Sequence, residues 1–273
     1  MTPSRRRFGQ HFLHDPAVIE RIVRAIDPHA GDRLLEIGPG HGALTRRLLQ
    51  SDLATLDAVE IDRDLAARLG AELAAHTRFA LHRADALELD IAALARRRGG
   101  TLRLAGNLPY NISTPLLFHL LDGSGSIADM HLMLQREVVA RITARPGTGE
   151  YGRLTVMLAP RVRAERLFDI GPGAFQPAPK VWSSLVRLEV LPEPPFAVAP
   201  DYGKVVAAAF SHRRKTLRNA LKGLVSPGEI EACGLDPGAR PETLAPRAFN
   251  DLAGAAAARA LSRHPSPSPP SMG

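Results

Sequence analysis

Short apolar runs alternate with helical patterns between about residues 30 and 190. The runs that predict buried strands are "RLLEIG", "LDAVEID", "FALHRAD", "TLRLAGN" and "MHLMLQ". Segments between them, such as "ALTRRLLQ" and "DLAARLGAELAAH", have apolar residues at helical spacing. Apolar strands that alternate with helices are typical of a mostly parallel sheet with helices on both faces. The pattern therefore predicts an α/β fold in which ligands bind beyond the carboxyl ends of the strands.

The pattern changes near residue 191. The stretch "LPEPPFAVAP" is rich in proline and predicts a linker. Helical patterns follow in "DYGKVVAAAFSHRRKTLRNALKGL", "PGEIEACGL" and "FNDLAGAAAARAL", whereas the tail "HPSPSPPSMG" has too little apolar content to pack. We therefore predict an α/β domain over residues 1–192, a small all-α domain over 193–263 and a disordered tail over 264–273.

The net charge of +7 in this chain of 273 residues is concentrated at its two ends. Residues 1–14 contribute +3, residues 200–263 contribute +4, and residues 15–199 hold equal numbers of acids and bases. A neutral body with basic ends suits a polyanion bound beside a site that is itself weakly charged. An arginine-rich composition explains the same excess, because 31 of the 35 basic residues are arginine.

Several classes of protein are excluded by composition. The single cysteine, Cys233, allows neither an internal disulfide framework nor a cysteine zinc site, and the histidines lack paired ligand spacing, so no metal is expected. The sequence contains no run of about eighteen apolar residues, so it predicts no membrane span. The N-terminal "SRRRF" resembles a twin-arginine export signal, but "GQHFLHDP" follows it without an apolar stretch. A cytoplasmic, monomeric protein is expected.

A glycine-rich loop, "LLEIGPGHGALT", separates the first strand from its helix and holds Gly38, Gly40 and Gly42. Glycines let a backbone turn tightly and approach a ligand, and the helix N-terminus offers unpaired N–H groups. The spacing matches the dinucleotide-binding pattern only loosely, so an ordinary turn is the alternative.

Acids at the next two strand ends sharpen the interpretation. Glu60 follows Gly38 by 22 residues, where a carboxylate can accept both hydroxyl protons of a ribose, and Asp85 in "RADAL" can accept from an adenine amino group. Asp62 is more typical of a solvated acid. The loop lacks "GK[ST]", and acidic strand ends favour a cofactor with a positive centre and no phosphate. S-adenosylmethionine fits, with Glu36 either near its sulfonium or amino end or in a structural hydrogen bond.

The stretch "LAGNLPYNISTP" ends a predicted strand with Asn107, Leu108, Pro109 and Tyr110. Such residues often only turn a chain. They also suit a pocket for an adenine, because the Asn107 oxygen and the Leu108 carbonyl can accept from N6, and Tyr110 can stack on the ring. Pro109 lacks an N–H and holds Leu108 extended, which lets that carbonyl face a pocket.

Taken in order, these motifs resemble the ribosomal RNA adenine N6-dimethyltransferase family (KsgA type). The resemblance runs nearly end to end and rests on "RRFGQHFLHD", "LEIGPGHGALT", "VEIDRD", "GNLPYNISTPLLFHLL", "MLQREVVARI", "YGRLTVM", "FQPAPKV" and "SHRRKTLRNAL". It implies a Rossmann-like class I methyltransferase domain with a small C-terminal all-α domain. It also implies two methyl transfers from S-adenosylmethionine to N6 of adjacent adenosines in small-subunit ribosomal RNA, with the subunit or its precursor as partner.

The resemblance assigns roles to single residues. The cofactor contacts it implies are His11, Leu13, Gly38, Glu60, Asp85 and Asn107. It places Phe175 of "FQPAPKV" opposite Tyr110, so that two rings enclose the target adenine; prolines after Phe175 favour an exposed loop over a core position. His11 stands where many members have asparagine, and Trp182 departs from the small or acidic residue expected there.

A basic run in the small domain predicts RNA contact. Its residues follow helical spacing, which suits either a solvated helix face or phosphate binding, and the resemblance favours phosphate binding. The run consists of Arg213, Arg214, Lys215 and Arg218. At the N-terminus, further RNA contacts are expected from Arg5, Arg6 and Arg7. Two rival functions remain open. One is dimethylation of large-subunit RNA, as in resistance methyltransferases, and the other is a noncatalytic nucleic-acid-binding assembly factor.

Overall fold

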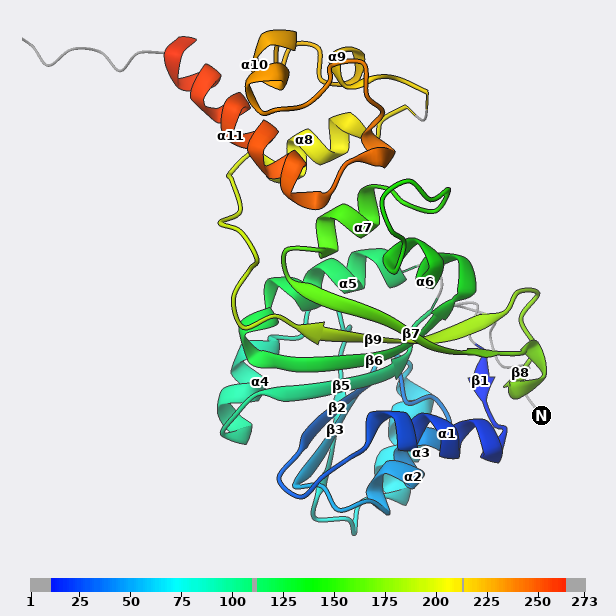
Figure 1. Cartoon of the computed structure of the whole chain (residues 1–273). Helices are drawn as coiled ribbons and strands as arrows, with labels where there is room; N and C mark the ends of the chain where they lie inside the picture. Colours follow the sequence, from blue (N-terminus) through cyan, green and yellow to red (C-terminus); the bar gives the residue numbers. More distant parts are fainter. Residues whose placement is uncertain (1–10, 110–111, 213, 264–273) are drawn as a thin grey trace, which may run out of the picture. The chain divides into compact units, whose positions relative to one another are not determined.

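A computed structural model describes residues 11–109, 112–212 and 214–263 of the chain (Figure 1). A central sheet has the strand order β4-β3-β2-β5-β6-β9-β7. Its strands are β2 (Arg33–Ile37), β3 (Thr55–Glu60), β4 (Phe79–Arg83), β5 (Leu102–Asn107), β6 (Ile127–Gln135), β7 (Val162–Ile170) and β9 (Ser183–Val190). Strands β2 to β6 are parallel, and β9 runs antiparallel to both neighbours. The predicted Rossmann-like sheet is confirmed.

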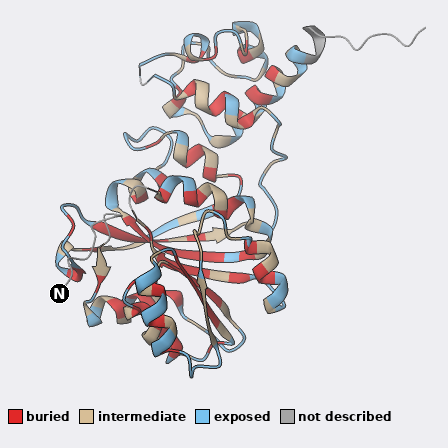
Figure 2. Cartoon of the chain, turned by 180° about the vertical axis from the view of Figure 1, so that it is seen from behind, coloured by how far each residue is buried: buried red, intermediate tan, exposed pale blue. Residues whose placement is uncertain are grey.

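The strands form where the sequence is apolar on both faces. In β2, Leu34, Leu35 and Ile37 are all buried, as expected for a strand covered on both sides. Figure 2 shows buried residues along the central strands. All of the runs predicted as strands in the first 135 residues lie in β2 to β6.

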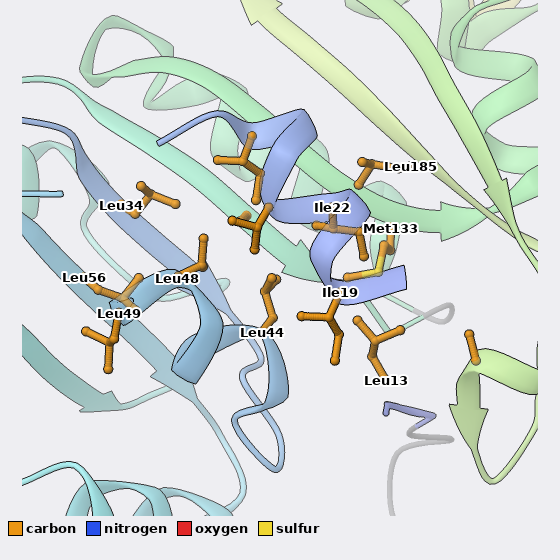
Figure 3. Packing of buried hydrophobic residues seen from close by; sticks show 14 of the residues in the cluster. Leu13, Ile19, Ile22, Leu34, Leu44, Leu48, Leu49, Leu56, Met133 and Leu185 are labelled. Atoms are coloured by element: carbon orange, nitrogen blue, oxygen red, sulfur yellow. The ribbon is translucent and has the colours of Figure 1, made fainter. Parts of the chain in front are cut away.

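Helices cover the sheet on both sides. Helices α1 (Pro16–Ile26), α2 (Ala43–Leu49) and α3 (Arg63–Glu72) lie on one side, and α5 (Ser113–Asp122) lies on the other (Figure 1). Helices α4 (Ile91–Arg98) and α6 (Arg136–Ile142) follow β4 and β6, and short 3-10 turns occupy Ser124–Ser126 and Pro172–Ala174. Ile19 and Ile22 of α1 and Leu44 and Leu48 of α2 join one hydrophobic cluster (Figure 3).

A second sheet, of two strands, pairs the N-terminal segment with a segment near residue 175. Strand β1 (Phe12–Leu13) pairs antiparallel with β8 (Phe175–Gln176). The His14 N–H continues the pairing by donating to the Ala174 carbonyl at 3.0 Å. Asp15 then caps α1, because its side chain accepts from the N–H groups of Ala17 and Val18. We call residues 11–15 the strap.

The remaining helices belong to a second compact unit, which comprises residues 141–160 and the described residues from 193 to 263. Its helices are α7 (Arg153–Leu158), α8 (Tyr202–Ala209), α9 (Leu217–Ala220), α10 (Pro227–Ala232) and α11 (Pro246–Arg263), with a 3-10 turn at Pro241–Thr243. It has its own hydrophobic cluster, which includes Tyr151, Tyr202 and Phe249. The Tyr151 hydroxyl donates to the Leu244 carbonyl at 2.6 Å. Residues 141–160, which the sequence pattern predicts to belong to the first domain, therefore pack with the second unit.

The basic run of the second unit is not a continuous helix face, contrary to the prediction. Helix α8 ends at Ala209 and α9 begins at Leu217. The N–H groups of Leu217 and Arg218 donate to the carbonyls of Ala239 and Pro237, at 2.9 and 3.1 Å. A continuous helix would direct these N–H groups to carbonyls four residues earlier, so the contact with the 237–239 segment separates the two helices.

Within the described part of the chain, every helix is too short or too polar to cross a lipid bilayer. Burial raises the pKa of the Cys233 thiol, which disfavours its reactive thiolate form.

Candidate active site at the carboxyl edge of the sheet

A cavity of about 230 Å³ lies at the carboxyl ends of the parallel strands. Loops after β2 and β4 and the last residues of β3 and β5 form its walls, and the strap closes it on another side. All of the residues that the resemblance assigns to the cofactor line this cavity: His11, Leu13, Gly38, Glu60, Asp85 and Asn107. The fold therefore gathers residues from five separate segments around one space.

The glycine loop forms one wall and approaches the strap closely. The Gly38 N–H donates to the Val59 carbonyl at 2.9 Å and so joins the loop to β3. Gly40 has a φ of +56°, and a Cβ atom there would lie 2.8 Å from Cδ1 of Phe12. Only glycine satisfies both conditions without strain, because side chains disfavour positive φ and this distance is too short for a carbon contact.

Glu60 at the end of β3 supports the loop. Its carboxylate accepts from the Gly40 N–H at 3.1 Å and from the Asp62 N–H at 2.9 Å. Burial raises the pKa of Glu60, and these backbone hydrogen bonds act in the opposite direction. Each carboxylate oxygen has a further lone pair, so Glu60 can hold the loop and still accept from a ligand hydroxyl.

Glu36 is the most deeply buried acid of the site, with 2% of its surface exposed. Burial raises the pKa of its carboxyl to about 7, and the negative charge of Glu60 adds to this effect. Its Oε2 atom has no hydrogen-bond partner within the described structure. A buried acceptor without a partner, in a residue that lines a cavity, favours a ligand contact over a purely structural role.

Asn107 is oriented by the strap. Its Nδ2 donates to the His11 carbonyl at 2.7 Å, which fixes the amide plane and leaves Oδ1 as the acceptor atom of this side chain. His11 is held in turn, because its Nδ1 lies 2.7 Å from the Pro177 carbonyl oxygen in the segment that follows β8. The strap therefore closes the cavity and sets the rotation of Asn107.

The backbone pairing of β5 with β6 continues for one residue beyond Asn107. The Leu108 N–H still donates to the Met133 carbonyl of β6, at 3.2 Å. The Pro109 carbonyl accepts from the Ile112 N–H at 3.2 Å. Asn107, Leu108 and Pro109 all line the cavity. Tyr110 lies outside the described residues.

Phe175 is buried, whereas the sequence predicts an exposed position. The prediction of an exposed loop is wrong, because Phe175 is 1% exposed and belongs to the same hydrophobic cluster as Leu13. Pairing of β1 with β8 places Phe175 opposite Leu13 and encloses its ring. A ring enclosed in this way would have to be uncovered before it could stack on a base, so a role of Phe175 beside the target adenine stays a prediction.

The residues predicted to contact RNA divide into two groups. Arg214, Lys215 and Arg218 are exposed in the second unit. The rest lie outside the described residues: Arg5, Arg6, Arg7 and Arg213. The structure therefore leaves an accessible basic segment at residues 214–218.

Sequence reasoning missed several residues that line the cavity. Phe12 packs against His41 with ring centroids 4.2 Å apart, and Ile61 is 46% exposed beside Glu60. Ile61 had a signal, since it directly follows the acid at the end of β3. Phe12 contacts His41 only because the strap lies against the glycine loop, and no local sequence pattern predicts that contact.

Comparison with solved structures defines the class of protein. A dimethyladenosine transferase from Plasmodium falciparum superposes with a TM-score of 0.74 at 22% identity, covering 89% of this chain and 96% of that one. The 23S rRNA methyltransferase ErmE superposes with a TM-score of 0.70 at 27% identity, covering 90% and 99%. The fold is that of the Rossmann-like methyltransferases.

Sequence comparison identifies the family. A family model described as ribosomal RNA adenine dimethylase matches residues 1–257. A ribosomal RNA small subunit methyltransferase A from Pseudomonas fluorescens is 54% identical over 256 residues, which is 92% of each chain. Its counterpart from Methylococcus capsulatus is 54% identical over 246 residues, covering 88% of this chain and 93% of the relative. The chain belongs to the ribosomal RNA adenine dimethylase family.

Proposed function

We propose that this protein transfers methyl groups from S-adenosylmethionine to N6 of two adjacent adenosines near the 3′ end of small-subunit ribosomal RNA. The product is N6,N6-dimethyladenosine, formed during ribosome biogenesis in the cytoplasm. The observation that carries the proposal is the cavity that Asn107, Glu36, Glu60 and Asp85 line together at one edge of the sheet.

The residues present fit S-adenosylmethionine. Glu60 can accept from the ribose hydroxyls, and Asp85, whose Oδ1 accepts from the Leu87 N–H at 2.9 Å, has a second oxygen for the adenine amino group. The partnerless Oε2 of Glu36 suits the positively charged end of the cofactor. When bound, the cofactor supplies an electrophilic methyl group on a sulfonium.

Asn107 positions the amine that accepts the methyl group. The lone pair of adenine N6 is delocalised into the ring, so the site must favour the tetrahedral geometry that develops during attack. With its Nδ2 held by the His11 carbonyl, Asn107 can direct Oδ1 at an N6 hydrogen. The Leu108 carbonyl is the second acceptor. Asn107 cannot act as a base, so it orients the amine and leaves the proton to solvent.

The second transfer constrains the pocket. After the first methyl group is added, N6 has one hydrogen left for two acceptors, so the amine must rotate and the pocket must admit the added bulk. The target base must also leave its stack, which is easiest in a loop or a partly assembled subunit. We infer that Tyr110 stacks on the extruded base from one face.

Small-subunit RNA is favoured over large-subunit RNA by sequence. Relatives named as small-subunit methyltransferases are 54% identical across 92% of the chain, whereas the 23S rRNA methyltransferase is 27% identical. The fold alone does not separate these substrates, because ErmE also superposes over 90% of the chain. A noncatalytic assembly factor is disfavoured because the cavity retains the acids and the amide that the reaction needs.

Transfer of a radiolabelled methyl group tests the proposal. We expect incorporation of label into undermethylated small subunits, with two methyl groups for each modified adenosine, and far less into large subunits or naked RNA. Label that enters large subunits preferentially would support the resistance-type activity. Absence of label in every substrate, with RNA still bound, would support the noncatalytic alternative.

Asn107→Ala tests the role of the amide. We expect transfer to fall by about a hundredfold or more, the magnitude found when one preorganised polar contact is removed. Cofactor affinity, measured by calorimetry, should fall by about fivefold or less, since one hydrogen bond to the strap is lost. Asn219→Ala, at an exposed position of the second unit, is the matched control. Full activity of Asn107→Ala would remove the argument for the pocket.

A further inference from the structure

Trp182 stands out because about half of this large apolar residue is not covered by packing. It is the only tryptophan of the chain. Its residue surface is 49% exposed, and that of its neighbour Val181 is 44% exposed. Burial of a tryptophan contributes strongly to stability, so an indole left half in water is more typical of a binding surface than of a core.

Trp182 lies at the same edge of the sheet as Asn107. The Arg136 N–H donates to the Trp182 carbonyl at 2.9 Å, one position beyond the last β6–β9 pair, Gln135 with Ser183. Asn107 pairs with Met133, three residues before Arg136. Along the strands, Trp182 lies three residues beyond Asn107, which corresponds to about 10 Å, and across the sheet it lies two strands away, which is again about 10 Å. Combining the two directions places Trp182 roughly 14 Å from Asn107.

The indole rests on a firm support. A Cβ atom built on Gly171 would lie 3.7 Å from Cη2 and Cζ3 of Trp182, so the ring packs against the backbone at this glycine. The backbone of Trp182 is fixed by the hydrogen bond from Arg136. One side of the indole is therefore supported while the rest is open to solvent, as a base-stacking platform requires.

The surroundings of the indole suit RNA. Lys180, two residues before Trp182, and Arg136, whose N–H donates to the Trp182 carbonyl, are both exposed. Within the described residues neither forms a salt bridge, although the charge of Arg136 helps to lower the pKa of Asp169. The acid nearby, Asp169, accepts from the Ser184 hydroxyl at 2.6 Å and is paired with Arg166. Two cations beside an aromatic ring are the usual components of a single-strand binding surface, where cations hold phosphates and rings hold bases.

We propose that Trp182 stacks on a base of the RNA that flanks the target adenosine, while Lys180 and Arg136 bind the neighbouring phosphates. This inference rests on the proposed function and extends it by one subsite. Trp182 acts as a positioning residue that holds the substrate strand across the edge of the sheet, beyond the cavity. Extrusion of the target base leaves its neighbours unstacked, and the indole replaces part of the stacking they lose.

Intrinsic fluorescence tests the contact directly, because all tryptophan emission comes from residue 182. We expect a short single-stranded oligoadenylate to quench this emission, with the same midpoint as RNA binding measured by filter retention. RNA that binds without any change in the emission would overturn the proposal. This titration needs no methyl transfer, so its outcome is independent of whether the proposed function holds.

Kinetics with variants give the second test, after wild-type protein has been shown to methylate small subunits. We expect Trp182→Ala to raise KM for the subunit by roughly 5- to 100-fold, the range for loss of one stacked base, with kcat and the KM for cofactor little changed. Trp182→Phe should restore most of the loss, and Val181→Ala should have little effect. Unchanged KM in Trp182→Ala, or a fall in kcat alone, would refute the stacking role.

Salt dependence separates the indole from its cations. Lys180→Gln should reduce the slope of log affinity against log salt by about one, whereas Trp182→Ala should lower affinity without changing the slope. An effect of Trp182→Ala on intact subunits without quenching by free RNA would indicate a protein contact instead and would overturn the proposal. Thermal unfolding of each variant excludes a general loss of structure.

Discussion

Replacing Glu36 by glutamine should stabilise the protein in the absence of cofactor. Burial raises the pKa of this carboxyl from its ordinary value of 4.5 to about 7. Above pH 7 the native state must hold a buried charge, whereas the unfolded chain holds the same charge in water. The rise in pKa corresponds to about 3 kcal/mol of lost stability, which is fully present above the native pKa.

The sign of the pH dependence follows from the same two pKa values. As pH falls through 7, the native carboxyl takes up a proton and the penalty shrinks; below 4.5 both states are protonated and it disappears. Glu36→Gln should therefore exceed wild type in free energy of unfolding by about 3 kcal/mol at about pH 8.5, and by about 1 kcal/mol or less at about pH 5.

Urea unfolding at the two pH values measures the difference. Glu193→Gln removes an exposed carboxylate and serves as the control. A Glu36→Gln protein that is less stable than wild type at the higher pH, or whose advantage does not change with pH, would refute the assignment of Glu36 as a buried carboxylate whose Oε2 atom lacks a partner. Stabilisation accompanied by weaker cofactor binding would support its role as a ligand contact.

Three further predictions concern the loop, the sheet and the basic segment. Gly40→Ala should cost about 1–2 kcal/mol in urea unfolding and weaken cofactor binding in calorimetry, because its backbone is left-handed. Arg98→Ala should cost about 3 kcal/mol at neutral pH, because it leaves Asp57 buried with only His82 as partner. Burial alone would raise the pKa of Asp57, but the hydrogen bonds from His82 and Arg98 hold it below its ordinary value, so this cost should shrink in acid. Lys215→Gln should lower RNA affinity and reduce its salt slope by about one.

Each of these outcomes can fail separately. Wild-type stability of Gly40→Ala would show that the loop tolerates a side chain beside the strap. A cost of Arg98→Ala that stays constant down to about pH 3 would mean that the carboxylate of Asp57 is not the source of the effect. An unchanged salt slope for Lys215→Gln would leave that residue as a solvated charge.

The central sheet was predictable because parallel strands carry their signal locally. Strands β2, β3, β5 and β6 are apolar runs in which most residues are buried, whereas β4, at the edge of the sheet, is half-buried. Strands β1 and β8 have two residues each, too few for any periodicity. Their pairing is decided by tertiary contacts, and the same pairing encloses Phe175, which the neighbouring prolines had suggested was exposed.

The sequence predicts which residues line the site better than it predicts the contacts between them. Motifs placed Glu60, Asp85 and Asn107 at successive strand ends, where a parallel sheet brings side chains together. The hydrogen bond from Asn107 to the His11 carbonyl joins residues 96 positions apart and has no signature in either motif. The break between α8 and α9 also depends on contacts between residues far apart in the sequence, because the carbonyls of residues 237 and 239 accept from the first N–H groups of α9.

The second unit is built from two separated stretches of chain, 141–160 and 193 onward. A fragment that begins at the proline-rich linker would lack Tyr151 and Val156, whose side chains are buried in the core of this unit. The unit is therefore not a portable module that can be excised or grafted by cutting at the linker. Exchange between family members would have to carry both stretches together, and a ribosome would complete this core only after the C-terminal stretch had emerged.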